Sequence, residues 1–81
     1  MMIRVLYFGT LAHELDTKSS KLDLSDNASV GEALDALAER HPGLEKHLSR
    51  VATAVNLEYV SPTHVLNNND ELALIPPVSG G

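Results

Sequence analysis

The fold of this chain is decided by the stretch Ser29–Arg40, SVGEALDALAER. Ser29 and Glu32 have the spacing of a capping box, in which each side chain bonds to the backbone N–H of the other residue. Apolar residues then recur at helical spacing along one stripe: Val30, Ala33, Leu34, Leu37 and Ala38. Because Pro42 disfavours a helical residue before it, the sequence predicts one amphipathic helix that ends near His41.

Apolar segments with the composition of β-strands lie on both sides of this helix. The first, Ile3–Phe8, is rich in β-branched and aromatic residues, and its alternation predicts that Ile3, Val5 and Tyr7 face the core. Its other face still carries Leu6 and Phe8. Further strands are predicted at 21–24, 51–55, 59–60 and 71–75. The last has Leu72 and Leu74 on one face, with Ala73 and Ile75 on the other.

Polar residues and turn formers separate these segments. Residues 11–15 form either a short helical turn or a loop, and the polar residues 16–20 form a turn. Leu44 and Leu48 have the spacing of one further helical turn that faces inward. Turns are also predicted at 56–58 and at 67–70, where asparagine and aspartate tolerate a left-handed backbone.

This order of elements predicts an α+β fold with two layers. One amphipathic helix must cover one sheet, and the helix lies between a first antiparallel pair of strands and the later strands. The pattern fits a β-grasp, a mixed sheet of four to five strands, with the first and last strands as parallel neighbours at its centre. We expect one domain over residues 1–75, followed by an extended tail over residues 76–81.

Composition excludes several classes of function. The 81 residues carry a net charge of −5, which lacks the basic footprint of a nucleic-acid-binding protein, and they include no cysteine. No signal peptide or transmembrane run is visible, so we expect a cytoplasmic protein that does not bind a membrane. The four histidines do not have the spacing of zinc ligands, and no nucleophile–base motif occurs. These features favour a carrier or binding module over an enzyme that acts alone.

The tail has a specified sequence, Pro76-Pro77-Val78-Ser79-Gly80-Gly81. The two prolines hold an extended backbone, and the two glycines could enter a channel too narrow for any side chain. Six residues span roughly 20 Å at about 3.3–3.6 Å each, enough to carry a terminal carboxyl group into the active site of a partner. Composition leaves two readings open: the Gly81 carboxyl group does the chemistry, or the tail is a flexible end with small residues.

Three segments resemble one known family. Residues 3–9 (IRVLYFG), residues 54–56 (AVN) and residues 70–81 (DELALIPPVSGG) are similar to the small subunits of molybdopterin synthase, which are ubiquitin-like sulfur carriers. The resemblance spans essentially the whole chain, and the PPVSGG ending is its most specific part. The thiamine-pathway carriers share the fold and the Gly-Gly end, but they are typically shorter and less often have the double proline.

The resemblance implies a chemical role for the last residue. The Gly81 carboxylate, next to Gly80, would be converted by an adenylating enzyme of the ubiquitin-activating type into an acyl-adenylate and then into a thiocarboxylate. The chain itself would bind no cofactor, since ATP is used by the activating enzyme. Inside the large subunit of molybdopterin synthase, the sulfur would pass to cyclic pyranopterin monophosphate to form molybdopterin.

The resemblance also implies an interface and an assembly. The family's exposed apolar patch maps onto Phe8, Tyr59 and Ile75, and the tail residues Pro76, Pro77, Val78 and Ser79 would enter the large subunit. The synthase would be a heterotetramer of two small and two large subunits. Two alternatives stay open: a sulfur carrier for thiamine, cysteine or tRNA thiolation, and a ubiquitin-like module that docks without sulfur chemistry.

Overall fold

The computed structural model describes residues 1–77 and contains a five-stranded sheet with helices packed against it. The elements in chain order are β1 (Met2–Tyr7), α1 (Gly9–Leu15), β2 (Ser19–Asp23), α2 (Val30–Arg40), a 3-10 turn (Pro42–Leu44), α3 (Glu45–Leu48), β3 (Ala52–Val55), β4 (Glu58–Val60) and β5 (Glu71–Ile75). No helix within residues 1–77 has the length and apolar character needed to cross a membrane.

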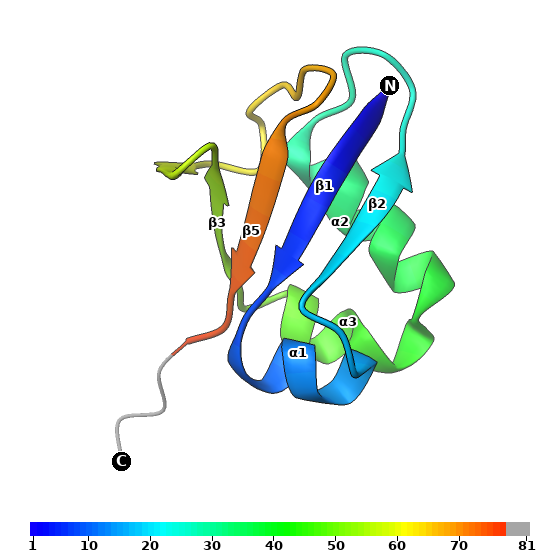
Figure 1. Cartoon of the computed structure of the whole chain (residues 1–81), viewed down its shortest axis with the longest axis vertical. Helices are drawn as coiled ribbons and strands as arrows, with labels where there is room; N and C mark the ends of the chain where they lie inside the picture. The colour runs from blue at the N-terminus through cyan, green and yellow to red at the C-terminus, as the bar shows by residue number, and fades with distance from the viewer. Residues whose placement is uncertain (78–81) are drawn as a thin grey trace.

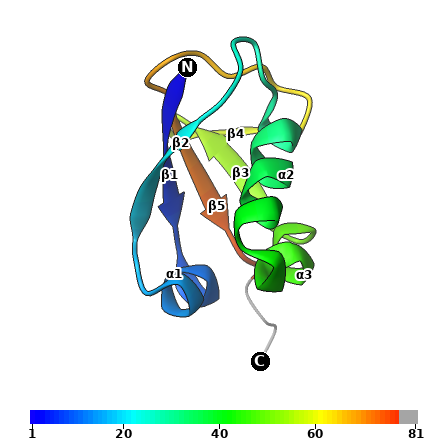
Figure 2. The ribbon, with the colours of Figure 1, turned by 90° about the vertical axis from the view of Figure 1, so that its right-hand side faces the viewer.

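The sheet is mixed, with the strand order β2-β1-β5-β3-β4. β1 runs parallel to β5, whereas the other neighbouring pairs are antiparallel. Figure 1 shows the sheet in front of α2, and Figure 2 shows α2 and α3 together on one of its sides. The predicted α+β arrangement with two layers is confirmed, as is the parallel pairing of the first and last strands at the centre of the sheet.

The core lies between the sheet and α2 and follows the predicted alternation. Ile3, Val5 and Tyr7 of β1 are buried, as are Leu72 and Leu74 of β5. The register places Val5 beside Leu72 and Tyr7 beside Leu74, so the two central strands present one continuous apolar surface. The helix side of the core is formed by Val30, Ala33, Leu37, Leu44 and Leu48.

The capping box at the start of α2 is present. The Glu32 backbone N–H donates to Ser29 Oγ over 3.2 Å, and the Ser29 backbone N–H donates to Glu32 Oε1 over 3.4 Å. At the other end the helix is capped by His41, directly before Pro42. Both ends of the helix therefore lie where the sequence predicts them.

Several strand boundaries differ from the prediction, including those of the first two strands. The first strand ends at Tyr7, so Phe8 is not a strand residue but the N-cap of α1, which begins at Gly9. The second strand covers Ser19–Asp23 and not 21–24, and the turn before it is correspondingly shorter. Ser19 and Ser20 extend in spite of their polar side chains because their backbones pair with Leu6 and Val5.

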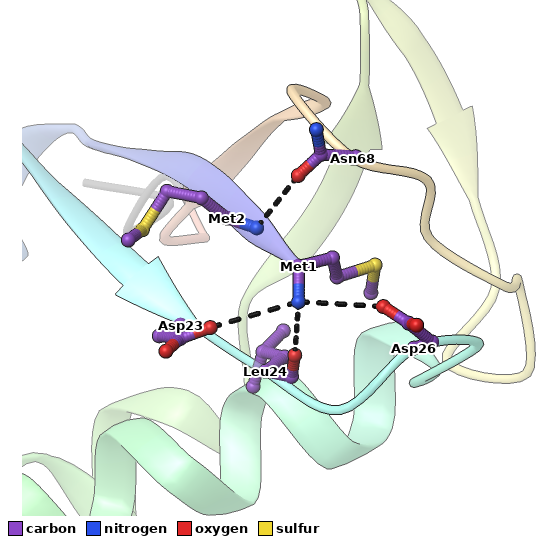
Figure 3. Close-up of polar contacts among 6 residues, drawn as sticks. All are labelled: Met1, Met2, Asp23, Leu24, Asp26 and Asn68. Carbon is purple, nitrogen blue, oxygen red and sulfur yellow. Dashed lines mark hydrogen bonds and ion pairs between the residues drawn. The ribbon is translucent and has the colours of Figure 1, made fainter.

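The amino end of β1 is held by polar contacts shown in Figure 3. The Met1 ammonium group donates to the Leu24 carbonyl oxygen over 2.6 Å and lies 3.6 Å from Asp23 Oδ1 and 3.4 Å from Asp26 Oδ1. The Met2 backbone N–H donates to Asn68 Oδ1 over 2.8 Å. These contacts tie the start of the central strand to the loops on either side of it.

The capping box gives the first prediction. Ser29→Ala should lower the free energy of unfolding by about 0.5–2 kcal/mol, because the Glu32 N–H loses its acceptor. Urea denaturation followed by circular dichroism measures this change. Ser25→Ala, in the exposed loop before the helix, is the matched control and should change stability by less than about 0.5 kcal/mol. Equal effects of the two substitutions would contradict a capping role for Ser29.

Candidate functional site

The candidate site begins where the central strand β5 ends and the tail leaves the sheet. β5 ends at Ile75, Pro76 is half-buried and Pro77 is exposed. In Figure 2 this exit lies at the same end of the sheet as α1. β1 and β5 are parallel, so both end at the same edge of the sheet. Phe8 and Gly9 follow β1 there, beside Ile75, the last residue of β5, and Pro76.

Gly9 is the residue that allows this close approach. Its φ is +56°, a left-handed conformation that residues with a Cβ atom disfavour. A Cβ atom at this position would lie 3.1 Å from Pro76 Cγ, closer than an ordinary van der Waals contact. Gly9 therefore fixes how the β1–α1 connection packs against the first residue of the tail.

Part of the sheet face opposite α2 is apolar, although Arg4, Lys21 and Glu71 lie on the same face. The register aligns four residues across it, Leu6 of β1, Ala73 of β5, Ala54 of β3 and Tyr59 of β4. Ile75 lies two residues after Ala73 on the same face of β5, beside Ala52 of β3. We call the side of the sheet that carries these six residues, together with Phe8, the outer face. Ala73 and Ala54, at the centre of the row, have smaller side chains than Leu6 and Tyr59 at its ends.

Two aromatic residues mark opposite ends of the outer face. Phe8 is 46% exposed and Tyr59 is 76% exposed, although both are large and apolar. Beside Phe8 lies an open hollow of about 450 Å³, lined by Leu6, Tyr7, Phe8, Gly9, Ala12 and Lys18. Exposed aromatic side chains next to a concave apolar surface are typical of protein interfaces.

The structure brings together some of the predicted interface residues. Phe8, Ile75 and Pro76 lie at the tail exit, whereas Tyr59 lies two strands from β5, about 10 Å away. Val78, Ser79, Gly80 and Gly81 fall outside the described residues. Assignment of these positions to an interface or a reaction stays a prediction.

Sequence reasoning missed Gly9, Ala54 and Ala73 as parts of this region. Ala73 could have been found from the alternation of β5, since it lies between two buried leucines. Gly9 could not, because its role depends on a contact with Pro76 that only the folded chain creates.

No cluster of three or more histidine, aspartate or glutamate side chains within residues 1–77 could hold a metal ion. His47 Nε2 lies 3.2 Å from Glu14 Oε1, a contact that joins α3 to α1 on the surface. His41 caps the end of α2. The features of this part of the chain that suit a docking surface are the exposed Phe8 and Tyr59 and the hollow beside Phe8.

Comparison with known proteins agrees with this geometry. The profile of the ThiS family matches residues 5–81. This chain belongs to the ThiS family. A molybdopterin synthase sulfur carrier subunit from Mycobacterium tuberculosis is 37% identical over 81 residues, which cover 98% of this chain and 96% of the relative. Small archaeal modifier protein 1 from Haloferax volcanii is 35% identical over 82 residues, 91% of this chain and 94% of the relative.

Solved structures of this ThiS-family fold superimpose over the full chain. SAMP1 from Haloferax volcanii matches with a TM-score of 0.89 and 32% identity, and the match covers 100% of both chains. A chain in the complex of subunits 1 and 2 of molybdopterin-converting factor from Helicobacter pylori matches with a TM-score of 0.70 and 26% identity, again over 100% of both chains. The predicted β-grasp fold and the resemblance to molybdopterin synthase small subunits are both confirmed.

The contact between Gly9 and Pro76 gives the second prediction. Gly9→Ala should lower the free energy of unfolding by about 1–2 kcal/mol, because the new methyl group meets Pro76 and the left-handed backbone becomes unfavourable. Gly43→Ala is the matched control, since a Cβ atom there would have no neighbour within 4 Å. Chemical denaturation compares the two variants. An equal change in the free energy of unfolding for Gly9→Ala and Gly43→Ala would show that Gly9 does not fix the tail exit.

Proposed function

We propose that this chain is the sulfur carrier subunit of a molybdopterin synthase and acts in the biosynthesis of the molybdenum cofactor. The observation that carries the proposal is the match to molybdopterin synthase sulfur carrier subunits at 31–37% identity over nearly the whole chain. The geometry supports it, because the described residues offer a docking face and a directed exit for the tail.

The proposed chemistry takes place on the Gly81 carboxyl group. A carboxylate is a poor acyl electrophile, so its oxygen first attacks the α-phosphorus of ATP on an adenylating enzyme of the ubiquitin-activating type, which releases pyrophosphate and leaves an acyl-adenylate. A sulfur nucleophile then attacks the carbonyl carbon, AMP leaves, and Gly81 becomes a thiocarboxylate. The bound tail presents this sulfur to cyclic pyranopterin monophosphate in an oriented form, which raises its effective concentration.

In this proposal the tail carries the reacting group, and the outer face binds the partner. Pro76 and Pro77 stiffen the exit from the sheet. Val78, Ser79 and Gly80 occupy a narrow channel of the large subunit, where the absence of a side chain on Gly80 leaves room beside the reacting carbonyl group. Phe8, Tyr59 and Ile75 bind the partner surface around that channel.

The proposed partners supply what this chain lacks. The large subunit provides the active site, in a heterotetramer of two small and two large subunits, and the solved complex of subunits 1 and 2 of molybdopterin-converting factor supports such a partner. The adenylating enzyme uses the ATP, so this chain binds no cofactor and is not an enzyme alone.

A second candidate function is favoured by a specific relative. Small archaeal modifier protein 1 matches this chain about as well as the synthase subunits do. This family therefore includes a member with a name that points to modification of other molecules. A carrier that serves another thiolation pathway, or a modifier, would use the same adenylated tail and would differ in the partner that accepts it.

Removal of the last residue tests the proposed chemistry. The full chain, incubated with its adenylating enzyme, ATP and sulfide, should gain the mass difference of one sulfur replacing one oxygen, and the large subunit should then form molybdopterin. A chain without Gly81 should keep its circular dichroism spectrum and form neither product. Normal sulfur transfer by the shortened chain would exclude the carrier function, whereas thiocarboxylate formation without molybdopterin would favour the second candidate.

Phe8 tests the docking face. Phe8→Ala should weaken association with the large subunit by roughly 1–4 kcal/mol, as expected for an aromatic anchor at an interface. Because the side chain is already 46% exposed, the melting temperature should change little. Val65→Ala is the control, since Val65 is 49% exposed and lies in the loop that bridges to Ser29. Titration calorimetry measures both. A lower melting temperature with unchanged binding would place Phe8 in the core instead.

A further inference from the structure

One exposed residue is held in a conformation that does not suit it. Five residues other than glycine have positive φ within residues 1–77: Asp16, Asn27, Asn56, Leu57 and Asn69. Four of them are aspartate or asparagine, which tolerate the left-handed region because their short polar side chains bond to the local backbone. Leu57 is the exception, with a φ of +74°. At this position of a two-residue hairpin, glycine is the favoured residue.

Burial does not compensate for this strain. Leu57 is 92% exposed, the highest value among the large exposed apolar residues of the described chain. Its side chain therefore gains almost nothing from the hydrophobic effect in the isolated protein. Neither local conformation nor packing within the described residues gives a reason for leucine here.

The turn that carries Leu57 is firmly anchored. The neighbouring Asn56 donates through Nδ2 to Asp70 Oδ1 over 3.0 Å and accepts from the Glu71 backbone N–H over 3.1 Å. The Asn56 backbone N–H donates to the Glu71 carbonyl oxygen over 2.9 Å. Asp70 is itself only 8% exposed and also accepts from the Asn67 N–H. The hairpin thus presents Leu57 in a fixed position.

The hairpin is continuous with the outer face. Tyr59 follows Leu57 by two residues on β4 and aligns with Ala54 in the row that crosses the sheet to Leu6. Because the backbone of this turn is already anchored, Leu57 loses little backbone entropy when a partner covers it. Leu57 therefore has the properties of an anchor at an interface.

We propose that Leu57 is a docking residue for the large subunit, which offers an apolar hollow opposite the β3–β4 hairpin. This inference rests on the proposed function and extends its docking face beyond Phe8, Tyr59 and Ile75. The large subunit is the occupant because Leu57 lies two residues from Tyr59, which the proposed function assigns to that subunit's interface, and the partner would extend from there over the hairpin, at the end of the sheet away from the tail exit. The left-handed backbone of Leu57 destabilises the free chain, and the contact of its side chain with the large subunit stabilises the complex.

The inference predicts that substitutions of Leu57 raise the stability of the free chain but weaken its binding to the large subunit, and the test measures both. Leu57→Gly removes the strain and the apolar group together, so the melting temperature should rise by about 2–5 °C. The dissociation constant for the large subunit should meanwhile increase roughly tenfold. Leu57→Asn keeps a residue that tolerates the turn and should change both quantities in the same directions. Val65→Ala, an exposed apolar position off the outer face, should change neither.

Each other outcome overturns the inference. If the Leu57 variants bind the large subunit within twofold of the unchanged chain, Leu57 is not a docking residue. If they weaken only self-association, or only binding to the adenylating enzyme, the partner is a different one. A fall in the melting temperature of Leu57→Gly would show that no strain is stored there. Failure of the unchanged chain to bind the large subunit at all would instead reject the proposed function, and this inference with it.

Discussion

The parallel pairing of β1 with β5 is the interaction on which the rest of the structure depends. It places Val5 beside Leu72 and Tyr7 beside Leu74, and all four side chains are almost completely buried. Parallel strands end at the same edge of a sheet, so this pairing also brings the start of α1 to the exit of the tail. One contact thus builds the centre of the core and sets where the tail leaves.

The two faces of these strands differ in burial. Successive side chains of a strand point to opposite faces, so Leu72 and Leu74 are buried while Ala73 and Ile75 lie on the outer face. A shift of one residue in the register would exchange these sets and bury the wrong face. Under the proposed function, substitutions at exposed positions of the outer face should alter recognition more than folding, and substitutions on the inner face should mainly lower stability.

The sequence predicts features that short-range patterns determine and misses those that tertiary contacts create. The cap at Ser29, the end of α2 near His41 and the inward faces of β1 and β5 depend on residues close in the chain, and all were predicted. The extension of β2 to Ser19 was not, because it depends on pairing with Leu6 and not on the serine itself. The interface assigned to Phe8, Tyr59 and Ile75 came from family resemblance, and the structure adds that Phe8 and Tyr59 are exposed while Ile75 is half-buried.

Two left-handed positions show how strain and function can be told apart. At Gly9 the backbone is left-handed and a Cβ atom would lie only 3.1 Å from Pro76 Cγ, so glycine suits both the conformation and the packing. At Leu57 the backbone is also left-handed, but the side chain lies in open solvent. Folding alone would favour glycine at both positions. The presence of glycine at one and leucine at the other indicates that Leu57 is explained by a contact outside this chain.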